Sequence, residues 1–307
     1  MTDMDRVEEL LDRLYGAEDD EETEQLAREV LALDDDNVEG LMLLADVVPY
    51  SEEKIGLLER AKGILEADSD DIPSLDTSDP EEQERCSLYM AVLQRLGFAY
   101  FSEGRHEDAL DLTIGLLDLD VDGLTLARSL YYRILIEMKR DRDVLEATMN
   151  DAERSASMLH SKAIALWRLS GPGDDAYMAL WEAFRAAPLV PFYILGYFDE
   201  PDEEDVDRTE EYNLALFFED AWSSETGLLN WLAQGTILLG LAASLFPRED
   251  TEKMMILADA LHIADSVEDA MVRLESRQDW AARTTDERID AAVALFVQGR
   301  YLPRDES

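Results

Sequence analysis

The chain has 307 residues, of which 27 are lysine or arginine and 71 are aspartate or glutamate, so its net charge at neutral pH is −44. Apolar residues make up 47% of the chain, which is enough to bury a core and excludes a wholly disordered acidic protein. The charge argues strongly against nucleic-acid binding, because that function needs a basic surface that replaces the counterions of the phosphates.

Cysteine and histidine are too sparse for the sites that depend on them. Cys86 is the only cysteine, which excludes an intrachain disulfide and a thiol-based zinc site. The three histidines, His106, His160 and His262, lie far apart in the sequence, and we expect no metal and no cofactor. The first residues are acidic and amphipathic, unlike a signal peptide, and they predict a reducing, cytoplasmic location.

The excess of acid has two explanations that the sequence leaves open. Negative charge keeps a protein soluble, and salt screens its self-repulsion, so a salt-rich cytoplasm explains the charge without any partner. A partner with a basic face explains it equally well. In either case we expect a monomer or a weak dimer that binds neither nucleic acid nor membrane.

Helical patterns dominate the chain from its first residues. Apolar residues recur at helical spacing in Val7, Leu10, Leu11 and Leu14, and again over residues 26–33. Strand-like alternation is scarce, and most prolines fall between the helical patterns, where each removes a helix donor. The pattern therefore predicts an all-α protein.

The clearest helix pair is predicted around residues 90–119. Its first helix carries Leu96-Gly97 and Tyr100, its turn carries Gly104, and its second helix carries Ala109. Small residues at positions 97 and 109 let the two helices approach closely, and Gly104 suits the turn. The segment resembles a tetratricopeptide repeat.

Units of about 34 residues place the other repeat starts at Met4, Val38, Leu124 and about Ser157. We therefore predict five helix pairs over residues 1–190, with an acidic insertion at about 68–86. The resemblance implies a TPR-like α-α superhelix, a right-handed solenoid whose concave groove is lined by first helices. Residues 191–307 are expected to form a C-terminal helical extension that packs on the solenoid and caps it.

The segment after residue 187 is no longer repetitive and shows a different likeness. It is similar to a segment that follows tetratricopeptide helices in the suppressor-of-tumorigenicity-seven family and its bacterial relatives. The likeness covers about 50 of the 307 residues. It is carried by Pro188, Val190, Pro191, Tyr193, Trp222, Gly227 and Leu232. The resemblance implies a helical-repeat scaffold and transfers no catalytic residue.

Residues 226–247 carry no charged side chain, and their length alone would allow a membrane span. Glycines and polar residues interrupt the stretch, among them Asn230, Gln234 and Ser244, and no basic cluster flanks it. We therefore expect a buried helix that closes the end of the solenoid, with a membrane-associated segment as the alternative.

Alternating carboxylates at Asp118, Asp120 and Asp122 precede Gly123 and match the first half of an EF-hand loop. Such a loop ends on a bidentate glutamate at its twelfth position, where this chain has Ser129. An inter-repeat turn explains the same residues. The three aspartates are therefore a weak calcium candidate only, and no metal site is predicted.

The resemblance assigns the concave groove to set positions on the first helix of each pair. In the last three repeats these positions are held by Gln94, Phe98, Phe101, Arg128, Tyr132, Leu135, Ser161 and Arg168. Arginine can hold a carboxylate with two hydrogen bonds, and aromatic rings supply apolar contact area. The groove predicts a protein or peptide ligand, basic or with a free carboxylate. The alternative is that the arginines pair with neighbouring acids and the rings pack between repeats.

Members of the repeat family that bind chaperone tails hold two carboxylates with lysine and asparagine in their first two repeats. Glu8, Asp12, Met42, Leu43 and Asp46 occupy those places here, which disfavours a chaperone-tail ligand. The chain also lacks a glycine-rich phosphate loop, a paired nucleophile and histidine, and a metal motif.

The expected function is therefore a protein- or peptide-binding scaffold with no chemistry of its own, and not an enzyme. Two alternatives stay open. One is an acidic decoy that occupies a basic or nucleic-acid-binding protein, and the other is an enzyme whose site is built from scattered residues.

Overall fold

The computed structural model describes residues 3–67, 79–202, 205–299 and 301–303. Within these ranges every regular element is a helix and no strand occurs, which confirms the predicted all-α class. The chain divides into two compact units, unit 1 (Met1–Ile134) and unit 2 (Leu135–Ser307). The change of architecture expected near residue 190 stays a prediction.

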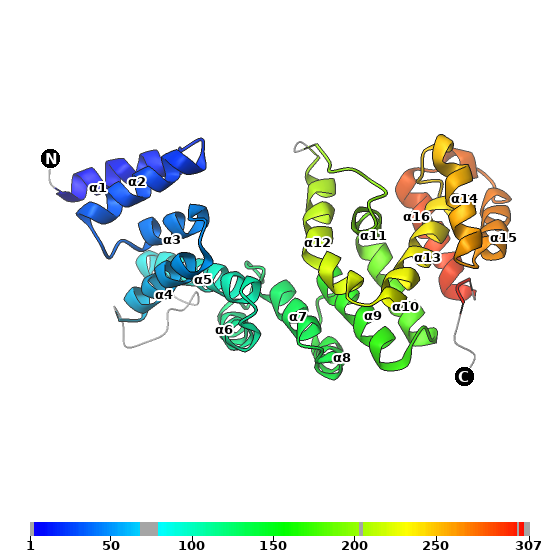
Figure 1. The fold of residues 1–307 in the computed structure, drawn as a ribbon, viewed down its shortest axis with the longest axis horizontal. Helices are drawn as coiled ribbons and strands as arrows, with labels where there is room; N and C mark the ends of the chain where they lie inside the picture. The colour runs from blue at the N-terminus through cyan, green and yellow to red at the C-terminus, as the bar shows by residue number, and fades with distance from the viewer. Residues whose placement is uncertain (1–2, 68–78, 203–204, 300, 304–307) are drawn as a thin grey trace. The chain divides into compact units, whose positions relative to one another are not determined.

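Unit 1 is a succession of helices in which each helix from α1 to α5 packs on the next (Figure 1). Its helices are α1 (Asp3–Tyr15), α2 (Asp20–Leu33), α3 (Val38–Val47), α4 (Ser51–Ala67), α5 (Pro80–Ser102) and α6 (His106–Leu119), and the unit ends within α7 (Ala127–Glu137). Neighbour-to-neighbour packing is the hallmark of a helical repeat, because no single helix pair can bury its apolar face alone.

The close helix contact predicted at Gly97 is present in α5. A Cβ atom at this position would lie 3.0 Å from Leu130 Cδ2 and 3.4 Å from Leu112 Cδ2. Ala109, the matching small residue of α6, is completely buried. The small residues that predicted a helix pair therefore mark real contact points between helices.

The acidic insertion predicted at about 68–86 stays a prediction. Residues 68–78 lie outside the described residues, but residues 80–86 form the first turns of α5. Asp79 caps this helix by accepting a hydrogen bond from the Glu81 N–H at 3.1 Å, and Pro80 follows at the first helical position. Acidic residues stabilise the start of a helix through its dipole, so a stretch with loop-like composition begins a helix here.

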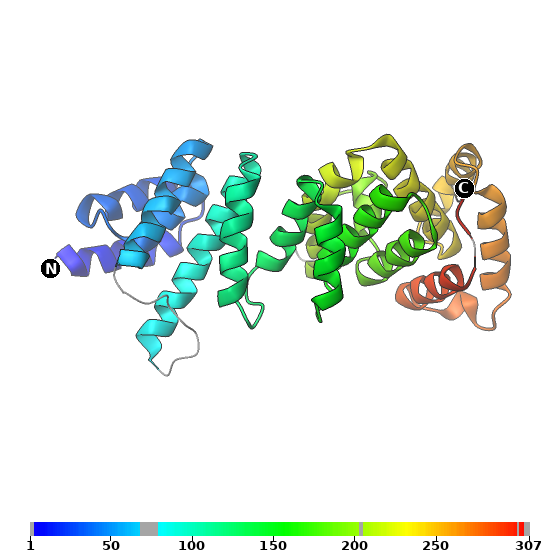
Figure 2. The same cartoon turned by 90° about the horizontal axis from the view of Figure 1, so that it is seen from below.

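Unit 2 begins with a helix succession and continues into a cluster. Its helices are α8 (Asp141–Asn150), α9 (Ala156–Ser170), α10 (Asp174–Ala186), α11 (Val190–Ile194), α12 (Val206–Ser223), α13 (Thr226–Ala242), α14 (Thr251–Ala260), α15 (Ala264–Glu275) and α16 (Thr285–Gln298), with short 3₁₀ turns η1 (Arg248–Asp250) and η2 (Trp280–Ala282). Helix α13 contacts α9, α11, α12, α14, α15 and α16 (Figure 2). It is the central element of the cluster.

The charge-free stretch 226–247 forms this central helix and the turn after it. Trp231, Leu232 and every residue from Gly235 to Ala242 are buried, which confirms the expected buried helix. No helix among the described residues is long and apolar enough to cross a membrane.

A buried histidine ties α9 to α12. The Trp222 indole N–H donates a hydrogen bond to His160 Nδ1 at 3.3 Å, and both side chains are completely buried. Burial disfavours the imidazolium and lowers the pKa of His160 to about 3. The histidine is therefore neutral at physiological pH and acts as a hydrogen-bond acceptor in the core.

The turn after α13 places an aromatic ring against a glycine. The Leu245 N–H donates to the Gly240 carbonyl at 2.8 Å, which reverses the chain and folds Phe246 back over the helix. A Cβ atom at Gly240 would overlap the Phe246 ring, which also packs against Phe192 with ring centroids 5.4 Å apart. Only glycine fits at position 240.

Gly240→Ala should lower the free energy of unfolding by about 1–3 kcal/mol, because the added methyl group must displace the packed Phe246 ring. Gly115→Ala is the matched control. Gly115 lies within α6 with open space at the Cβ position, so alanine there should stabilise by about 1 kcal/mol through helix propensity. Urea unfolding followed by circular dichroism measures both changes, and equal effects of the two variants would contradict the packing account.

Glu211 of α12 is a half-buried carboxylate that caps the short helix α11. Its Oε2 atom accepts hydrogen bonds from the N–H groups of Leu189 at 2.6 Å and Val190 at 3.2 Å. Burial raises the pKa of Glu211 to about 7, even though the two N–H groups and Arg208 favour the charged form. The folded protein therefore holds a proton that the unfolded chain releases at lower pH.

The contribution of Glu211 to stability should be complete below pH 4.5, its ordinary pKa, and should decline until about pH 7. Across that window the unfolded chain loses the proton while the folded chain keeps it. Relative to Glu211→Gln, the wild type should lose about 2 kcal/mol of unfolding free energy between about pH 4.5 and pH 7. Denaturant titrations at several pH values test this, with the exposed Glu219→Gln of the same helix as control. A difference between wild type and Glu211→Gln that does not change with pH would refute it.

Candidate functional site

The residues predicted to line the groove are divided between the two units. Unit 1 contains Gln94, Phe98 and Phe101 on α5, and Arg128 and Tyr132 on α7. Unit 2 contains Leu135 at the end of α7, and Ser161 and Arg168 on α9. The groove as a whole stays a prediction, and the surroundings of each member are described within its own unit.

Two of the predicted residues meet in a pocket of unit 1. Gln94 and Phe98 line a cavity of about 270 Å³ between α3, α4 and α5. The cavity is also lined by Asp46, Lys54, Leu58 and Arg95. It opens beside the turn at Pro49, which follows the C-cap residue Val48 of α3 and prevents the helix from continuing. The α3–α4 turn and one face of α5 therefore shape the pocket together.

The pocket combines cationic groups with apolar walls. Arg95 Nε donates to Asp46 Oδ1 at 3.0 Å and to Oδ2 at 3.1 Å, and Nη1 donates to the Ala91 carbonyl at 3.5 Å, which orients the guanidinium and leaves Nη2 for a further contact. Lys54 is half-buried and has no carboxylate at ion-pair distance among the described residues. Leu58 is buried and Phe98 half-buried, so apolar surface lies next to the charges.

Gln94 leaves its amide N–H₂ group available to a ligand. Its Oε1 atom accepts a hydrogen bond from the Leu126 N–H at 2.6 Å, which fixes the side chain. The acceptor is thereby used within unit 1. Donors from Gln94, Lys54 and Arg95 therefore converge on one cavity, and such a donor set suits a carboxylate.

Phe101 lies outside the lining of this cavity and packs instead beside a buried arginine. The Arg133 guanidinium lies 5.1 Å from the centre of the Phe101 ring, and the His106 ring lies 5.6 Å from it. Arg128 is half-buried on α7. Sequence reasoning missed Arg133 because the position is one step away from those that the repeat resemblance assigns to the groove.

Three predicted groove residues offer no accessible surface to a ligand. Tyr132, Leu135 and Ser161 are each at most 2% exposed. The aromatic ring of Tyr132 packs edge-on against Tyr131. For these side chains the structure corrects the expectation, because they contribute to the core.

Arg168 is also a structural residue. This agrees with the alternative given above, in which the arginines pair with neighbouring acids instead of binding a ligand. Its Nη1 donates to the Ile136 carbonyl at 2.8 Å and lies 3.5 Å from Asp141, and its Nη2 donates to Ser224 Oγ at 3.0 Å. The side chain is only 7% exposed. Burial raises the pKa of Asp141, and the charge of Arg168 opposes that rise. This arginine joins the end of α7 and the start of α8 to the α12–α13 turn.

The weak calcium candidate is an inter-repeat turn. Asp120 is buried, and its carboxylate accepts hydrogen bonds from the N–H groups of Leu124 at 2.6 Å and Thr125 at 2.8 Å. Asp118 and Asp122 are exposed. Among the described residues no group of three or more metal-ligating side chains gathers at one place. The carboxylate of Asp120 therefore already accepts hydrogen bonds from the backbone segment that leads into α7.

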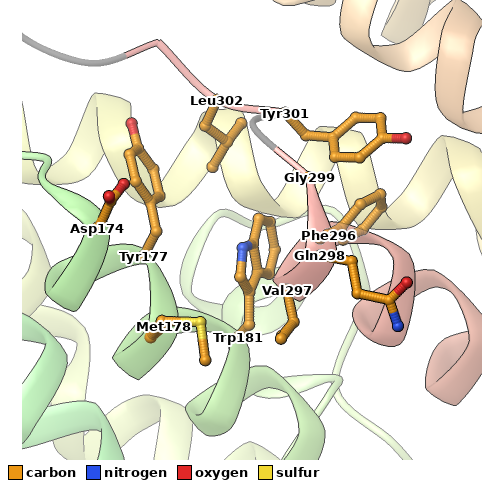
Figure 3. Close-up of a pocket in the computed structure, with 10 residues that line it drawn as sticks. All are labelled: Asp174, Tyr177, Met178, Trp181, Phe296, Val297, Gln298, Gly299, Tyr301 and Leu302. Atoms are coloured by element: carbon orange, nitrogen blue, oxygen red, sulfur yellow. The ribbon is translucent and has the colours of Figure 1, made fainter.

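A further hollow, of about 290 Å³, lies where the C-terminal segment crosses α10. Figure 3 shows Trp181 on one side of it and Leu302 on the other. Tyr177 donates a hydrogen bond to the Pro303 carbonyl, and Tyr301 donates to Asp269 at 3.0 Å. Tyr301 and Leu302 are buried, so residues 301–303 cover α10 and complete the core of unit 2.

No family model matches the chain, and no curated protein or solved structure matches it significantly. The resemblances to tetratricopeptide repeats and to the suppressor-of-tumorigenicity-seven family therefore stay predictions. The function has to be argued from the chemistry of the chain's own residues.

Asp120→Ala should lower the free energy of unfolding by about 1–2 kcal/mol, because it leaves two backbone N–H groups without their acceptor. Asp118→Ala and Asp122→Ala are controls that should change stability by less than about 0.5 kcal/mol. Thermal unfolding with and without calcium completes the test. A melting temperature that rises with calcium in the wild type and not in Asp120→Ala would restore the metal site.

Proposed function

We propose that the protein is a helical-repeat scaffold that binds a peptide segment in the pocket between α3, α4 and α5 of unit 1, without chemistry of its own. The observation that carries the proposal is the convergence of Gln94 and Phe98 with Lys54 and Arg95 on one cavity. Two of these residues were predicted as groove residues from the repeat resemblance.

The chemistry of the pocket favours a ligand with a carboxylate over a basic one. Lys54 supplies a cation that has no carboxylate at ion-pair distance among the described residues, and Arg95 keeps its Nη2 group for a ligand. A peptide carboxylate can accept from both, while its neighbouring side chain contacts Phe98 and Leu58. In a chain of net charge −44, such local cations are needed before an anionic group can approach.

The proposal predicts that Lys54→Gln weakens peptide binding about tenfold or more, because it removes a charged donor from the pocket. The probe is an array of immobilised short peptides, each present with a free and with an amidated C-terminus, incubated with the full chain. Peptides with a free carboxylate should be bound preferentially, and Phe98→Ala should weaken the same peptides.

Lys62→Gln is the matched control, because Lys62 lies on the same helix and outside this pocket. The proposal is wrong if Lys54→Gln and Lys62→Gln bind the array alike, or if amidation has no effect on binding. An acidic decoy would behave differently. It would capture basic proteins through exposed carboxylates, lose them at moderate salt, and be indifferent to Lys54→Gln. The cytoplasmic location belongs to the same proposal and is tested by fractionation of the native host.

A further inference from the structure

A cavity of about 750 Å³ in unit 2 lies where the end of α13 meets η1, α15, η2 and α16. Its size falls within the range of small-molecule binding sites. It is separate from the pocket proposed to bind peptide, and the peptide-binding proposal does not use it. Its lining is unusual in this acidic chain, because it contains three arginines.

The three arginines, Arg248, Arg277 and Arg288, have no ion-pair partner among the described residues. Several other arginines stand beside carboxylates, as Arg95 beside Asp46 and Arg273 beside Asp269. Here three arginines without such a pair among the described residues line one cavity of a chain that has 71 acidic residues. Unpaired guanidinium groups around a cavity are suited to an anion that enters from solution.

Arg288 supplies the sharpest sign of an unmet interaction. Its Nε atom is buried and has no hydrogen-bond partner in the described structure. A buried donor without an acceptor is costly, and most such groups in folded proteins are satisfied. A ligand oxygen in the cavity would supply the acceptor.

The local charge balance is the reverse of that of the whole chain. Glu275 and Asp279 are the acidic residues in the lining, against the three arginines. The whole chain instead has 71 acidic residues against 27 basic ones. The cavity is thus a place where an anion can approach a protein that repels anions elsewhere.

The remaining walls are apolar and aromatic. Trp280, Phe246, Met271 and Leu241 line the cavity, and the Arg283 guanidinium lies 5.9 Å from the centre of the Trp280 ring. Flat rings and aliphatic side chains beside cations fit a ligand with a charged end and an unsaturated or apolar body. An inorganic ion has no apolar part that could contact these walls.

The backbone around the cavity is held in an uncommon conformation at two places. Ser244 and Asp279 both line it and have positive φ angles of 58° and 64°. Residues with a Cβ atom seldom adopt this conformation, and where it persists the surrounding structure enforces it. The turns that present the lining are therefore fixed in place before any ligand binds.

We propose that this cavity binds a small organic phosphate of about nucleotide size, with the phosphate held by Arg248, Arg277 and Arg288 and the body of the ligand against Trp280. A phosphate presents more acceptor oxygens and more negative charge than a carboxylate, and so uses several arginines at once. The site adds a second, independent ligand to the peptide of unit 1.

Titration of the full chain with ADP, inorganic pyrophosphate and adenosine tests the proposal. Calorimetry should show saturable binding of ADP, weaker binding of pyrophosphate, and no binding of adenosine, which lacks the phosphates. ADP should also quench tryptophan fluorescence in the wild type. In Trp280→Phe most of that quenching should vanish, because the reporting ring has been removed.

Arg277→Gln and Arg288→Gln should each weaken ADP binding about tenfold or more, as expected for the loss of a hydrogen bond to a charged group. Arg273→Gln is the matched control, because it removes the same charge from nearby α15 but lies outside the cavity lining. Circular dichroism checks the fold of each variant. If Arg288→Gln fails to fold, Arg248→Gln takes its place, since Arg248 is exposed.

Four results would overturn the proposal. The first is the absence of saturable ADP binding up to about 1 mM, a weak affinity for any specific site. The second is a loss of affinity in Arg273→Gln equal to that in Arg277→Gln. The third is pyrophosphate binding as tightly as ADP, which would mean that the apolar walls contribute nothing. The fourth is citrate binding more tightly than either phosphate probe, which would assign the cavity to carboxylates.

Discussion

Burial of the apolar faces of adjacent helices is the constraint on which the rest of the structure depends. A chain of net charge −44 repels itself, and only the removal of apolar surface from water can hold it in a compact form. In unit 1 this burial is shared between successive helices, and in unit 2 it is gathered around α13. Where α5 packs closely on α6 and α7, the side chain is small, as at Gly97.

Given this acidic background, the role of each arginine follows from what surrounds it. Arg168 is enclosed and contacts a carbonyl, a hydroxyl and a carboxylate of its own unit, so it stabilises the fold. Arg95 is held by one carboxylate but keeps donors directed elsewhere. Arg277 and Arg288 line a cavity, and neither has a carboxylate at ion-pair distance within the described part of the chain. The same residue type thus supports the core in one place and offers a binding group in another, and its neighbours decide which.

The sequence predicted the helix pairs well, because helix formation depends on local features. Apolar spacing and small residues located the pair around Gly97 and Gly104, and the absence of charge located the buried α13. Prediction from the sequence failed where the position of a side chain depends on residues that are distant in the chain. The burial of Ser161 and the contacts of Arg168 with Ser224 cannot be read from a repeat register. The repeat count placed residues 80–86 in an acidic insertion, and composition alone did not indicate that they begin α5.

The candidate sites also divide into residues that the local sequence predicted and residues that it missed. Gln94 and Phe98 were predicted from their register, but Lys54 was not, because it lies on the second helix of a pair and reaches the pocket through the α3–α4 turn. The arginine cavity of unit 2 was missed altogether. Arg248, Arg277 and Arg288 follow no shared spacing and come together only because η1, η2 and α16 pack around the end of α13.

The internal ties of unit 2 have a consequence for how this chain can vary in evolution. Arg168 and His160 of α9 form hydrogen bonds with Ser224 and Trp222, more than fifty positions further along the chain. A fragment that stopped after α10 would leave a guanidinium and an imidazole facing solvent or an empty core. Recombination that joins the helices after α10 to another scaffold would break these hydrogen bonds. We therefore expect α9 and the helices after α10 to be inherited together.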